Sequence, residues 1–181
     1  DPVSGGYFDS MNRDWSVRLD TKSFSSEITP VSGYLYYLYL ATRDEQYLKQ
    51  TEKILDIVLM KMSDPKSGWI LENFDRNWNY TVKDRTVNEV NIGHNIETAW
   101  MLLRANLLNE RTDYLNAAKK LSESVHQYGF NKETGVWYAN VAKDNSENHR
   151  ELAYWWTQAY GGMFNLTQYH IDKKDTYLEN F

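Results

Sequence analysis

A turn followed by a short hairpin occurs three times in this chain and constrains its fold more than any other feature. The copies start at Asp1, Asp64 and Asn131, which are 63 and 67 residues apart, and the third copy is the weakest. A second short turn follows each copy: Arg13-Asp14-Trp15, Arg76-Asn77-Trp78 and Lys143-Asp144-Asn145. Asp, Pro and Gly favour turns, and alternating aromatic and polar residues favour strands. We therefore predict three repeats, which start near residues 1, 64 and 131.

Hydrophobic residues at helical spacing fill the intervals between these turns. The first set follows Pro30 and predicts a helix of about three turns, with Pro30 tolerated in its first turn: Val31, Tyr34, Leu35 and Leu38. Asp44 is placed to cap a second helix that ends near Ser63. Further helices are predicted over residues 92–108, 114–125 and 152–169, with Asp175 opening a partner of the last. Each repeat thus contains a hairpin and two helices.

Repeated helical hairpins stack either into an open solenoid or into a closed toroid, and periodicity alone does not distinguish the two. Tetratricopeptide solenoids repeat near 34 residues, whereas a period in the sixties with a hairpin insert is typical of the double-layered toroids of carbohydrate enzymes. We predict an all-α fold, part of an (α/α)6 toroid built of helical hairpins with short β-hairpin inserts. Residues 1–181 would form one partial barrel domain.

Composition excludes several classes of function. The chain has 20 Lys+Arg against 25 Asp+Glu, with the basic residues scattered, so we expect no nucleic-acid partner. The longest apolar run is too short for a membrane helix. Cysteine is absent and no two histidines have His-x-x-x-His spacing, so we expect no metal and no cofactor. A reducing compartment is compatible, and we expect a cytoplasmic location. Aromatic residues make up 15% of the chain, which suits a pocket that stacks on sugar rings.

Three motifs resemble one family. Residues 93–102 read Gly-His-Asn-Ile-Glu-Thr-Ala-Trp-Met-Leu, which closely resembles the Gly-His-Asp-Ile-Glu-Ala-Ser-Trp-Leu-Leu motif of cellobiose 2-epimerases and a related motif of N-acylglucosamine 2-epimerases. Residues 155–159 resemble the family's Trp-Trp-Pro/Val-Gln-Ala, and residues 64–68 and 74–79 resemble its Asp-Pro-Glu-Thr-Gly and Phe-Asp-Glu-Asp-Trp-Asn. The resemblance implies a sugar 2-epimerase of which this chain is the middle to C-terminal portion. A second catalytic histidine would then lie beyond Phe181.

Epimerisation at C2 of an aldose requires a base that removes the proton next to the aldehyde and a proton source on the opposite face. Histidine suits this role because its pKa lies near neutral pH. His94 is the candidate, since the positive end of a helix that starts near Asn91 favours the neutral imidazole. Glu97 is the second catalytic candidate, because it lies on the same helical face and would orient the imidazole or hold a sugar hydroxyl.

The resemblance also implies a sugar-binding surface made of Trp155, Trp156, Trp100 and Tyr160. Adjacent helical residues point about 100° apart, so we expect one of the two neighbouring tryptophans, Trp156, to line the pocket and the other to pack. The remaining histidines match no family motif, and we expect packing or solvated roles for them: His126, His149 and His170. The expected partner is a monosaccharide or disaccharide. Because half a ring would expose apolar helix faces, we also expect that either a homodimer or the missing remainder of the protein covers them.

Several positions depart from the family pattern. Residues 22–29 align with a family segment that reads Lys-Ser-Met-Asn-Thr-His-Leu-His, in which the Asn and the second His contact substrate in cellobiose epimerases. Here Ser25 replaces the Asn, Glu27 the first His and Thr29 the second, and Tyr160 replaces a Glu. These changes remove hydrogen-bonding groups that position hydroxyls, so cellobiose in particular is in doubt as a substrate.

Three alternatives remain open. A glycoside hydrolase on the same toroid would need two carboxylates, for which Asp84, Glu89 and Glu97 are available. An aldose–ketose isomerase would use the same enediolate and return the proton elsewhere. A non-catalytic protein on a decayed epimerase scaffold would bind sugar without exchanging any hydrogen.

Overall fold

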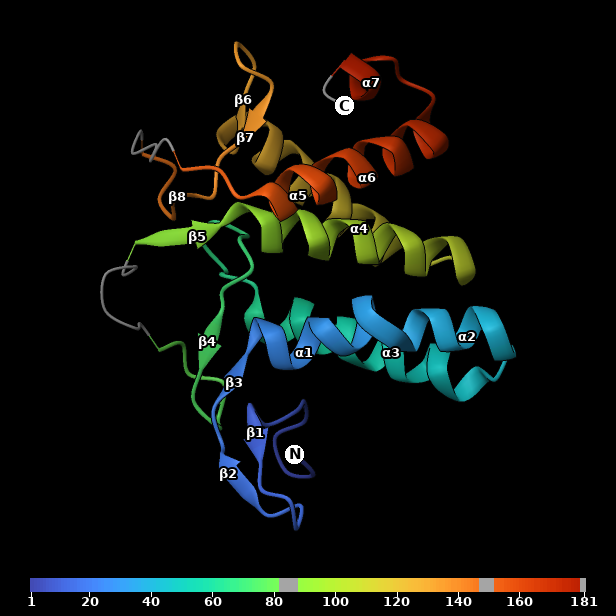
Figure 1. Ribbon diagram of the computed structural model, residues 1–181, viewed down its shortest axis with the longest axis vertical. Coiled ribbons are helices and arrows are strands. Elements are labelled where there is room, and N and C mark those ends of the chain that lie inside the picture. Colours follow the sequence, from blue (N-terminus) through green and yellow to red (C-terminus); the bar gives the residue numbers. More distant parts are fainter. Residues whose placement is uncertain (82–87, 147–151, 180–181) are drawn as a thin grey trace. The chain divides into compact units, whose positions relative to one another are not determined.

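The computed structural model describes residues 1–81, 88–146 and 152–179, and it is mostly helical with short strands (Figure 1). The predicted all-α fold is therefore correct in its dominant element type. The chain divides into two compact units, described here one at a time. The first holds residues 1–65 and 70–87, and the second holds residues 66–69 and 88–181.

The first unit is built on two long helical segments. One runs through α1 (Phe24–Pro30), the π-helical turn η1 (Val31–Leu35) and α2 (Tyr36–Thr42), and the other through α3 (Glu45–Ile57) and the π-helical turn η2 (Val58–Met62). Arg43, in the left-handed conformation, ends α2, and Asp44 caps α3 by accepting from the Gln46 N–H as predicted. The two segments run alongside each other (Figure 1), and their facing residues are buried: Ile28, Val31, Leu35, Ile54, Leu55 and Val58.

The predicted start of the first helix is wrong. The helix begins at Phe24, six residues before Pro30, because Ser23 and Ser26 form a capping box in which each side chain satisfies the other's backbone N–H. Pro30 therefore lies inside the helical segment rather than in its first turn. Proline cannot donate the usual i to i−4 hydrogen bond, and the helix widens into the π turn directly after it.

Short strands complete the first unit. Strand β1 (Ser10–Met11) pairs with β2 (Val17–Leu19) as a hairpin, and β3 (Lys22–Ser23) pairs antiparallel with β4 (Asn73–Phe74). Ser23 is thus both the last strand residue and the cap of α1. Strand β3 pairs with a strand that lies about fifty residues later in the sequence. This pairing holds Lys22 and Ser23 extended, so the helix starts only after Ser23.

The second unit has three long helices that lie side by side (Figure 1). These are α4 (Ile92–Leu108), α5 (Thr112–Tyr128) and α6 (Trp155–Asp172), and a short α7 (Thr176–Glu179) follows. The observed bounds of α4 confirm the predicted ones. Helix α6 starts three residues later than predicted, because the Leu152 carbonyl accepts a hydrogen bond from the Ala139 N–H and holds that segment extended.

The strands of the second unit lie just before α4 and between α5 and α6. Strand β5 (Glu89–Asn91) leads directly into α4 and pairs antiparallel with β8 (Asn140–Ala142), and β6 (Phe130–Asn131) pairs with β7 (Val136–Trp137). The core of the unit is built from buried residues of α4 and of its neighbours: Ile96, Met101, Leu102, Tyr114, Leu121, Val125 and Phe164.

The three motif copies share backbone geometry. Gly5, Gly68 and Gly135, the fifth residue of each copy, have φ values of 74°, 80° and 71°. The second turns also match, since Trp15, Trp78 and Asn145 have φ between 61° and 67° and each donates its N–H to the carbonyl three residues earlier. This common geometry accords with the motif, while the division of the chain into three repeats stays a prediction.

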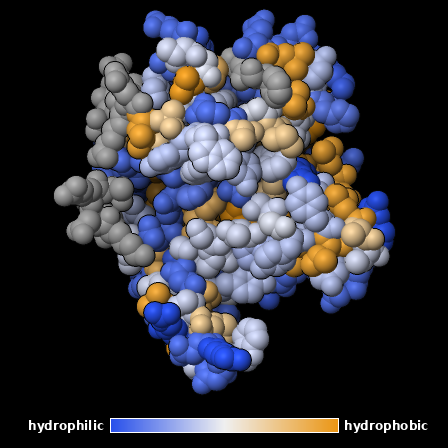
Figure 2. Space-filling view, viewed as in Figure 1, coloured by the Kyte–Doolittle hydropathy of each residue, from blue (hydrophilic) through white to orange (hydrophobic). Residues whose placement is uncertain are grey.

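Hydrophobic side chains also reach the surface, for example over α2 of the first unit (Figure 2). Tyr34, Tyr37 and Leu38 are exposed there, although the sequence pattern placed Tyr34 and Leu38 on the buried stripe. None of the helices in the described ranges has the length and apolar character that a membrane crossing would require.

Candidate sugar site

The predicted catalytic histidine lies at the start of α4 in the second unit. Asn91 ends strand β5 and caps the helix, because its side-chain oxygen accepts a hydrogen bond of 3.0 Å from the His94 N–H. The Asn95 side chain donates to the Asn91 carbonyl at 2.9 Å, and Thr98 donates to the His94 carbonyl at 2.9 Å. The backbone at His94 is therefore held at both of its polar groups. The imidazole itself is half-buried.

Glu97 lies one turn further along α4 and is only 7% exposed. The Tyr160 hydroxyl from α6 donates to its carboxylate at 3.1 Å. A buried carboxylate needs hydrogen-bond donors to offset its lost hydration, and this phenol supplies one. Tyr160 thus contacts the second catalytic candidate directly, although it stands where the family pattern has a Glu.

Trp156 packs beside the imidazole. Its ring centroid lies 5.3 Å from that of His94, and Tyr154 stacks on it at 6.0 Å with an angle of 11° between the ring planes. Gly93 makes this approach feasible, since a Cβ at that position would lie 2.2 Å from Trp156 Cζ3 and 2.7 Å from Thr157 Oγ1. The glycine before the histidine in the motif therefore has a packing role, because only a residue without a side chain admits the indole.

Trp100 extends the aromatic surface along α4. Its ring meets Tyr160 edge-on at 5.6 Å, and its indole N–H donates to Thr167 Oγ1 at 3.0 Å. The Arg104 guanidinium lies over the ring at 4.6 Å from the centroid. Because the indole N–H and one ring face are already occupied, Trp100 is held in one orientation. It forms one side of the candidate site.

Five of the six predicted site residues are therefore brought together, and Trp155 is not. Trp155 is 81% exposed, so the expectation that it packs is wrong. Trp155 is the first residue of α6, and no helix or strand in the described ranges covers its side chain. His126 is half-buried, with Nδ1 2.8 Å from the Ser122 carbonyl and Nε2 2.9 Å from Asn165 Oδ1, and His170 is exposed. His149 and Asp84 lie outside the described residues.

The segment that departs from the family pattern lies in the first unit, on α1. Ser25 and Thr29 are exposed and, four residues apart, share one face of the helix, whereas Glu27 points inward and is 0% exposed. The Glu27 carboxylate accepts from the Tyr7 N–H at 2.7 Å. Burial raises the pKa of Glu27 to about 7, although this hydrogen bond and Lys22 act in the opposite direction. The residue that replaces the family's first His is thus a buried titratable group.

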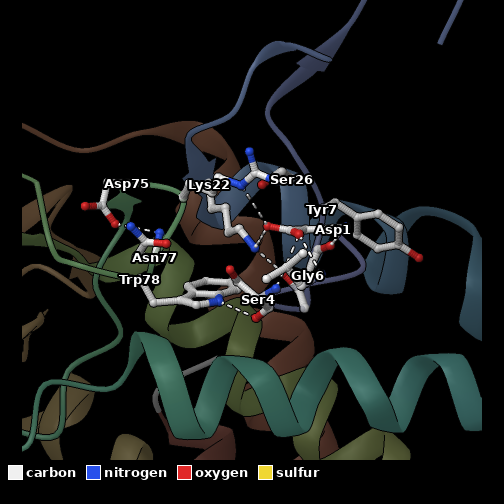
Figure 3. Close-up of polar contacts among 12 residues, drawn as sticks. Asp1, Ser4, Gly6, Tyr7, Lys22, Ser26, Asp75, Asn77 and Trp78 are labelled. Carbon is white, nitrogen blue, oxygen red and sulfur yellow. Dashed lines mark hydrogen bonds and ion pairs between the residues drawn. The ribbon is translucent and has the colours of Figure 1, made fainter. Parts of the chain in front are cut away.

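Lys22, whose charge acts on Glu27, belongs to a polar cluster with Asp1 (Figure 3). Its ammonium lies 3.1 Å from Asp1 Oδ2, donates to the Gly5 carbonyl and sits 4.5 Å from the centroid of the Trp78 ring. Burial lowers the pKa of Lys22. The Trp78 indole in turn donates to the Ser4 carbonyl at 2.8 Å. This cluster ties the first motif copy to the second turn of the next copy.

Within the described part of the chain, no three His, Asp or Glu side chains are grouped so that they could hold a metal ion. The chemistry available at the start of α4 is that of an imidazole, a carboxylate and aromatic faces. Those groups suit proton transfer to and from a carbon acid and stacking on a sugar ring.

Residues 1–168 match the family model described as N-acylglucosamine 2-epimerase (GlcNAc 2-epimerase). The chain belongs to the N-acylglucosamine 2-epimerase family. The resemblance drawn from the three motifs is confirmed by this match.

Solved structures agree on the fold of this family member. A D-mannose isomerase matches with a TM-score of 0.86 at 20% identity, over 99% of this chain and 46% of that one. The cellobiose 2-epimerase of Spirochaeta thermophila DSM 6192 matches with a TM-score of 0.81 at 20% identity, over 99% and 46%. A family 76 glycoside hydrolase from a bovine Bacteroides thetaiotaomicron strain matches with a TM-score of 0.75 at 14% identity, over 97% and 35%. The chain thus spans less than half the length of these proteins.

Sequence reasoning missed three contributors to the site. Tyr154 stacks on Trp156 and Thr167 holds the Trp100 indole, but neither belongs to a motif. The hydrogen bond from Tyr160 to Glu97 joins residues 63 positions apart. A helical wheel shows on which side of a helix each residue lies. It would have placed these residues at the contact between α4 and α6 only after the two helices were known to pack together.

Proposed function

We propose that this protein is a sugar epimerase or isomerase that transfers a proton at C2 of an aldose through His94. The observation that carries the proposal is the arrangement at the start of α4, where a half-buried imidazole lies 5.3 Å from the Trp156 ring and one turn before a carboxylate. The family match supports the same reaction class.

In this mechanism His94 removes the C2 proton from the open-chain sugar, and the charge develops on the enediolate oxygens. Proton transfer by a positioned base contributes typically about 10²- to 10⁴-fold in rate. Glu97, fixed by the Tyr160 hydroxyl at 3.1 Å, would accept a hydrogen bond from a sugar hydroxyl or from the imidazole. Its position one turn from His94 keeps it on the same side of α4.

Trp156 and Trp100 would form the surface on which the sugar ring stacks. Their rings are already oriented by Tyr154, Tyr160 and Thr167, so little side-chain entropy is lost when a ligand binds. Tyr160 would present a hydroxyl where the family has a carboxylate, which favours a substrate other than cellobiose. We expect a monosaccharide or a different disaccharide.

We further propose that the two units form part of an (α/α)6 toroid. Support comes from the shared fold with the D-mannose isomerase and the cellobiose 2-epimerases. Since the chain covers under half of each of those proteins, the activity and the substrate concern the whole protein in which the chain occurs.

The second candidate is a glycoside hydrolase, which the fold shared with family 76 enzymes favours. Hydrolysis needs two carboxyl groups about 5 to 9.5 Å apart across the scissile bond. Glu97 accepts a hydrogen bond from the Tyr160 hydroxyl, and the imidazole one turn before it on α4 has no part in this two-carboxylate mechanism.

Product analysis in D₂O separates the candidates. The protein, as its gene encodes it, is incubated with aldoses and disaccharides and followed by NMR. An epimerase gives the C2 epimer with deuterium at C2, and an isomerase gives the ketose with solvent deuterium. A hydrolase releases reducing ends, and a binding protein shows only a calorimetric signal. Cleavage or binding without C2 exchange would contradict the proposal.

A further inference from the structure

The second unit contains a polar cavity that the sugar site does not use. Its volume is about 230 Å³, and it opens between α5, the end of α6 and the turn into α7. Its lining residues include Ser122, Glu123, Gln168, Asp172, Lys174 and Tyr177. Gln168 lies twelve residues beyond Trp156 on α6, which at 1.5 Å per residue is about 18 Å along the helix. The cavity is therefore separate from the residues around His94.

Gln168 is the unexplained residue of this cavity. It is 4% exposed, and its side-chain N–H donates to Ser122 Oγ at 2.6 Å. Its Oε1 is buried and has no hydrogen-bond partner among the described residues. If the two amide atoms are exchanged, the Ser122 hydroxyl donates to oxygen and the amide nitrogen is left unpaired instead. In both orientations one buried amide atom lacks a partner, which destabilises the empty cavity.

The wall behind Gln168 is rigid. Ser122 is 6% exposed and lies on α5 one turn before His126, whose Nδ1 is 2.8 Å from the Ser122 carbonyl and whose Nε2 is 2.9 Å from Asn165 Oδ1. The His126 ring also packs edge-on against Trp137 at 5.1 Å. If the Gln168 amide turned away, it would lose its hydrogen bond to Ser122 Oγ.

The rim of the cavity carries both charge signs. Lys119 and Lys174 supply donors, and Glu123 and Asp172 supply acceptors, so the two signs balance. An anion such as phosphate would face as many carboxylates as ammonium groups. Tyr177 adds an aromatic wall, and its hydroxyl lies 3.4 Å from Asp172 Oδ2. Burial, with Asp172 as a further cause, raises the pKa of Tyr177, so this hydroxyl remains a neutral donor.

The volume of the cavity and the polar groups that line it together define the ligand. With roughly 30 Å³ per water, the cavity holds about seven waters or one molecule the size of a monosaccharide. Hydroxyl groups both donate and accept, so they would satisfy Gln168 in either orientation together with the mixed donors and acceptors of the rim. We propose that this cavity binds a neutral polyhydroxylated molecule of monosaccharide size, with Gln168 at its base, as a second site separate from the one at His94.

Titration with myo-inositol tests the proposal, because this polyol has no aldehyde and is not a substrate for C2 chemistry. Binding is measured by NMR titration of the protein as its gene encodes it. Gln168→Leu, which leaves an apolar side chain and removes both amide atoms, is expected to weaken binding at least tenfold. Trp156→Ala, in the site at His94, is expected to leave it unchanged within twofold.

A second variant and a check that both variants are folded complete the test. Asp172→Ala changes a rim residue and is expected to weaken binding three- to tenfold, while thermal melts show that both variants stay folded. Unchanged affinity in Gln168→Leu and Asp172→Ala would overturn the proposal. So would loss of binding in Trp156→Ala, tighter binding of glycine or inorganic phosphate than of myo-inositol, or a soaked crystal that shows only ordered water at Gln168.

Discussion

At the scale of single residues, the packing around His94 depends on the absence of a side chain at the position before it. Gly93 has no unusual backbone conformation, and its role is to leave space for Trp156. A protein interior transmits even a single added methyl group to its neighbours. The residue before His94 is thus restricted by the packing of Trp156 rather than by chemistry.

We expect Gly93→Ala to destabilise the protein by about 1–3 kcal/mol, since the new Cβ would overlap Trp156 and Thr157. Sugar affinity should fall with it, because the indole is displaced from His94. Urea unfolding and sugar titration measure both effects. Gly33→Ala is the matched control: it also lies in a helical segment, nothing lies within 4 Å of its added Cβ, and it should be neutral or stabilising by up to about 1 kcal/mol.

The raised pKa of Glu27 predicts how the free energy of unfolding depends on pH. Its pKa is about 7 in the folded protein against 4.5 for an unperturbed glutamate carboxyl, so the folded state holds a proton that the unfolded state has already lost between these values. Its contribution is fully present below pH 4.5 and disappears as the pH rises through 7. The change is on the order of 3 kcal/mol.

Comparison of urea unfolding in the parent protein and in Glu27→Gln, between pH 4.5 and 7.5, isolates this contribution. The stability of the parent protein should fall between these pH values as Glu27 loses its proton. The stability of the variant should not show this fall, because glutamine stays neutral throughout. Parallel pH profiles for the two proteins would show that Glu27 does not titrate in this range.

At the scale of the elements, sequence patterns predicted helices better where local signals agreed. The bounds of α4 were predicted correctly because Asn91 is a good cap and the apolar spacing starts at once. The start of α1 was missed because Pro30 looked like a first-turn residue, while the serine capping box that begins seven residues earlier precedes a segment with few apolar residues. The delayed start of α6 depends on a backbone hydrogen bond to Ala139, which no local pattern contains.

The site shows the same limit. The motif around His94 pointed to the candidate residues on α4, and helical geometry predicted that only one of the two neighbouring tryptophans would line the site. The bond between Tyr160 and Glu97 and the exposure of Trp155 depend on how α6 packs on α4. Such contacts are made by residues far apart in the sequence, so periodicity within one helix does not predict them.

The cap of α4 gives a prediction at this scale. Asn91→Ala removes the acceptor for the His94 N–H and should cost about 0.5–2 kcal/mol of stability. Asn91→Asp keeps an acceptor at the positive end of the helix and should stay close to the parent protein. Thermal unfolding of the two variants provides the comparison, and an equal loss in both would show that the hydrogen bond is not what holds the helix start.

At the scale of the whole molecule, the chain is a member of a sugar epimerase family that spans less than half of the solved structures it resembles. The homodimer and the cytoplasmic location stay predictions. Sedimentation velocity tests the first: we expect the mass of two chains at micromolar concentration, because apolar residues such as Tyr34 and Leu38 are exposed. A monomer at all concentrations would contradict it.

The central claim is that the imidazole at the start of α4 exchanges the C2 hydrogen of a sugar. The direct test is the rate of deuterium uptake at C2 in D₂O, measured for the parent protein, His94→Gln and the matched control His126→Gln. We predict that His94→Gln lowers the rate at least 100-fold while sugar binding and folding persist, and that His126→Gln exchanges within tenfold of the parent. Exchange in His94→Gln at the parent rate would contradict the account.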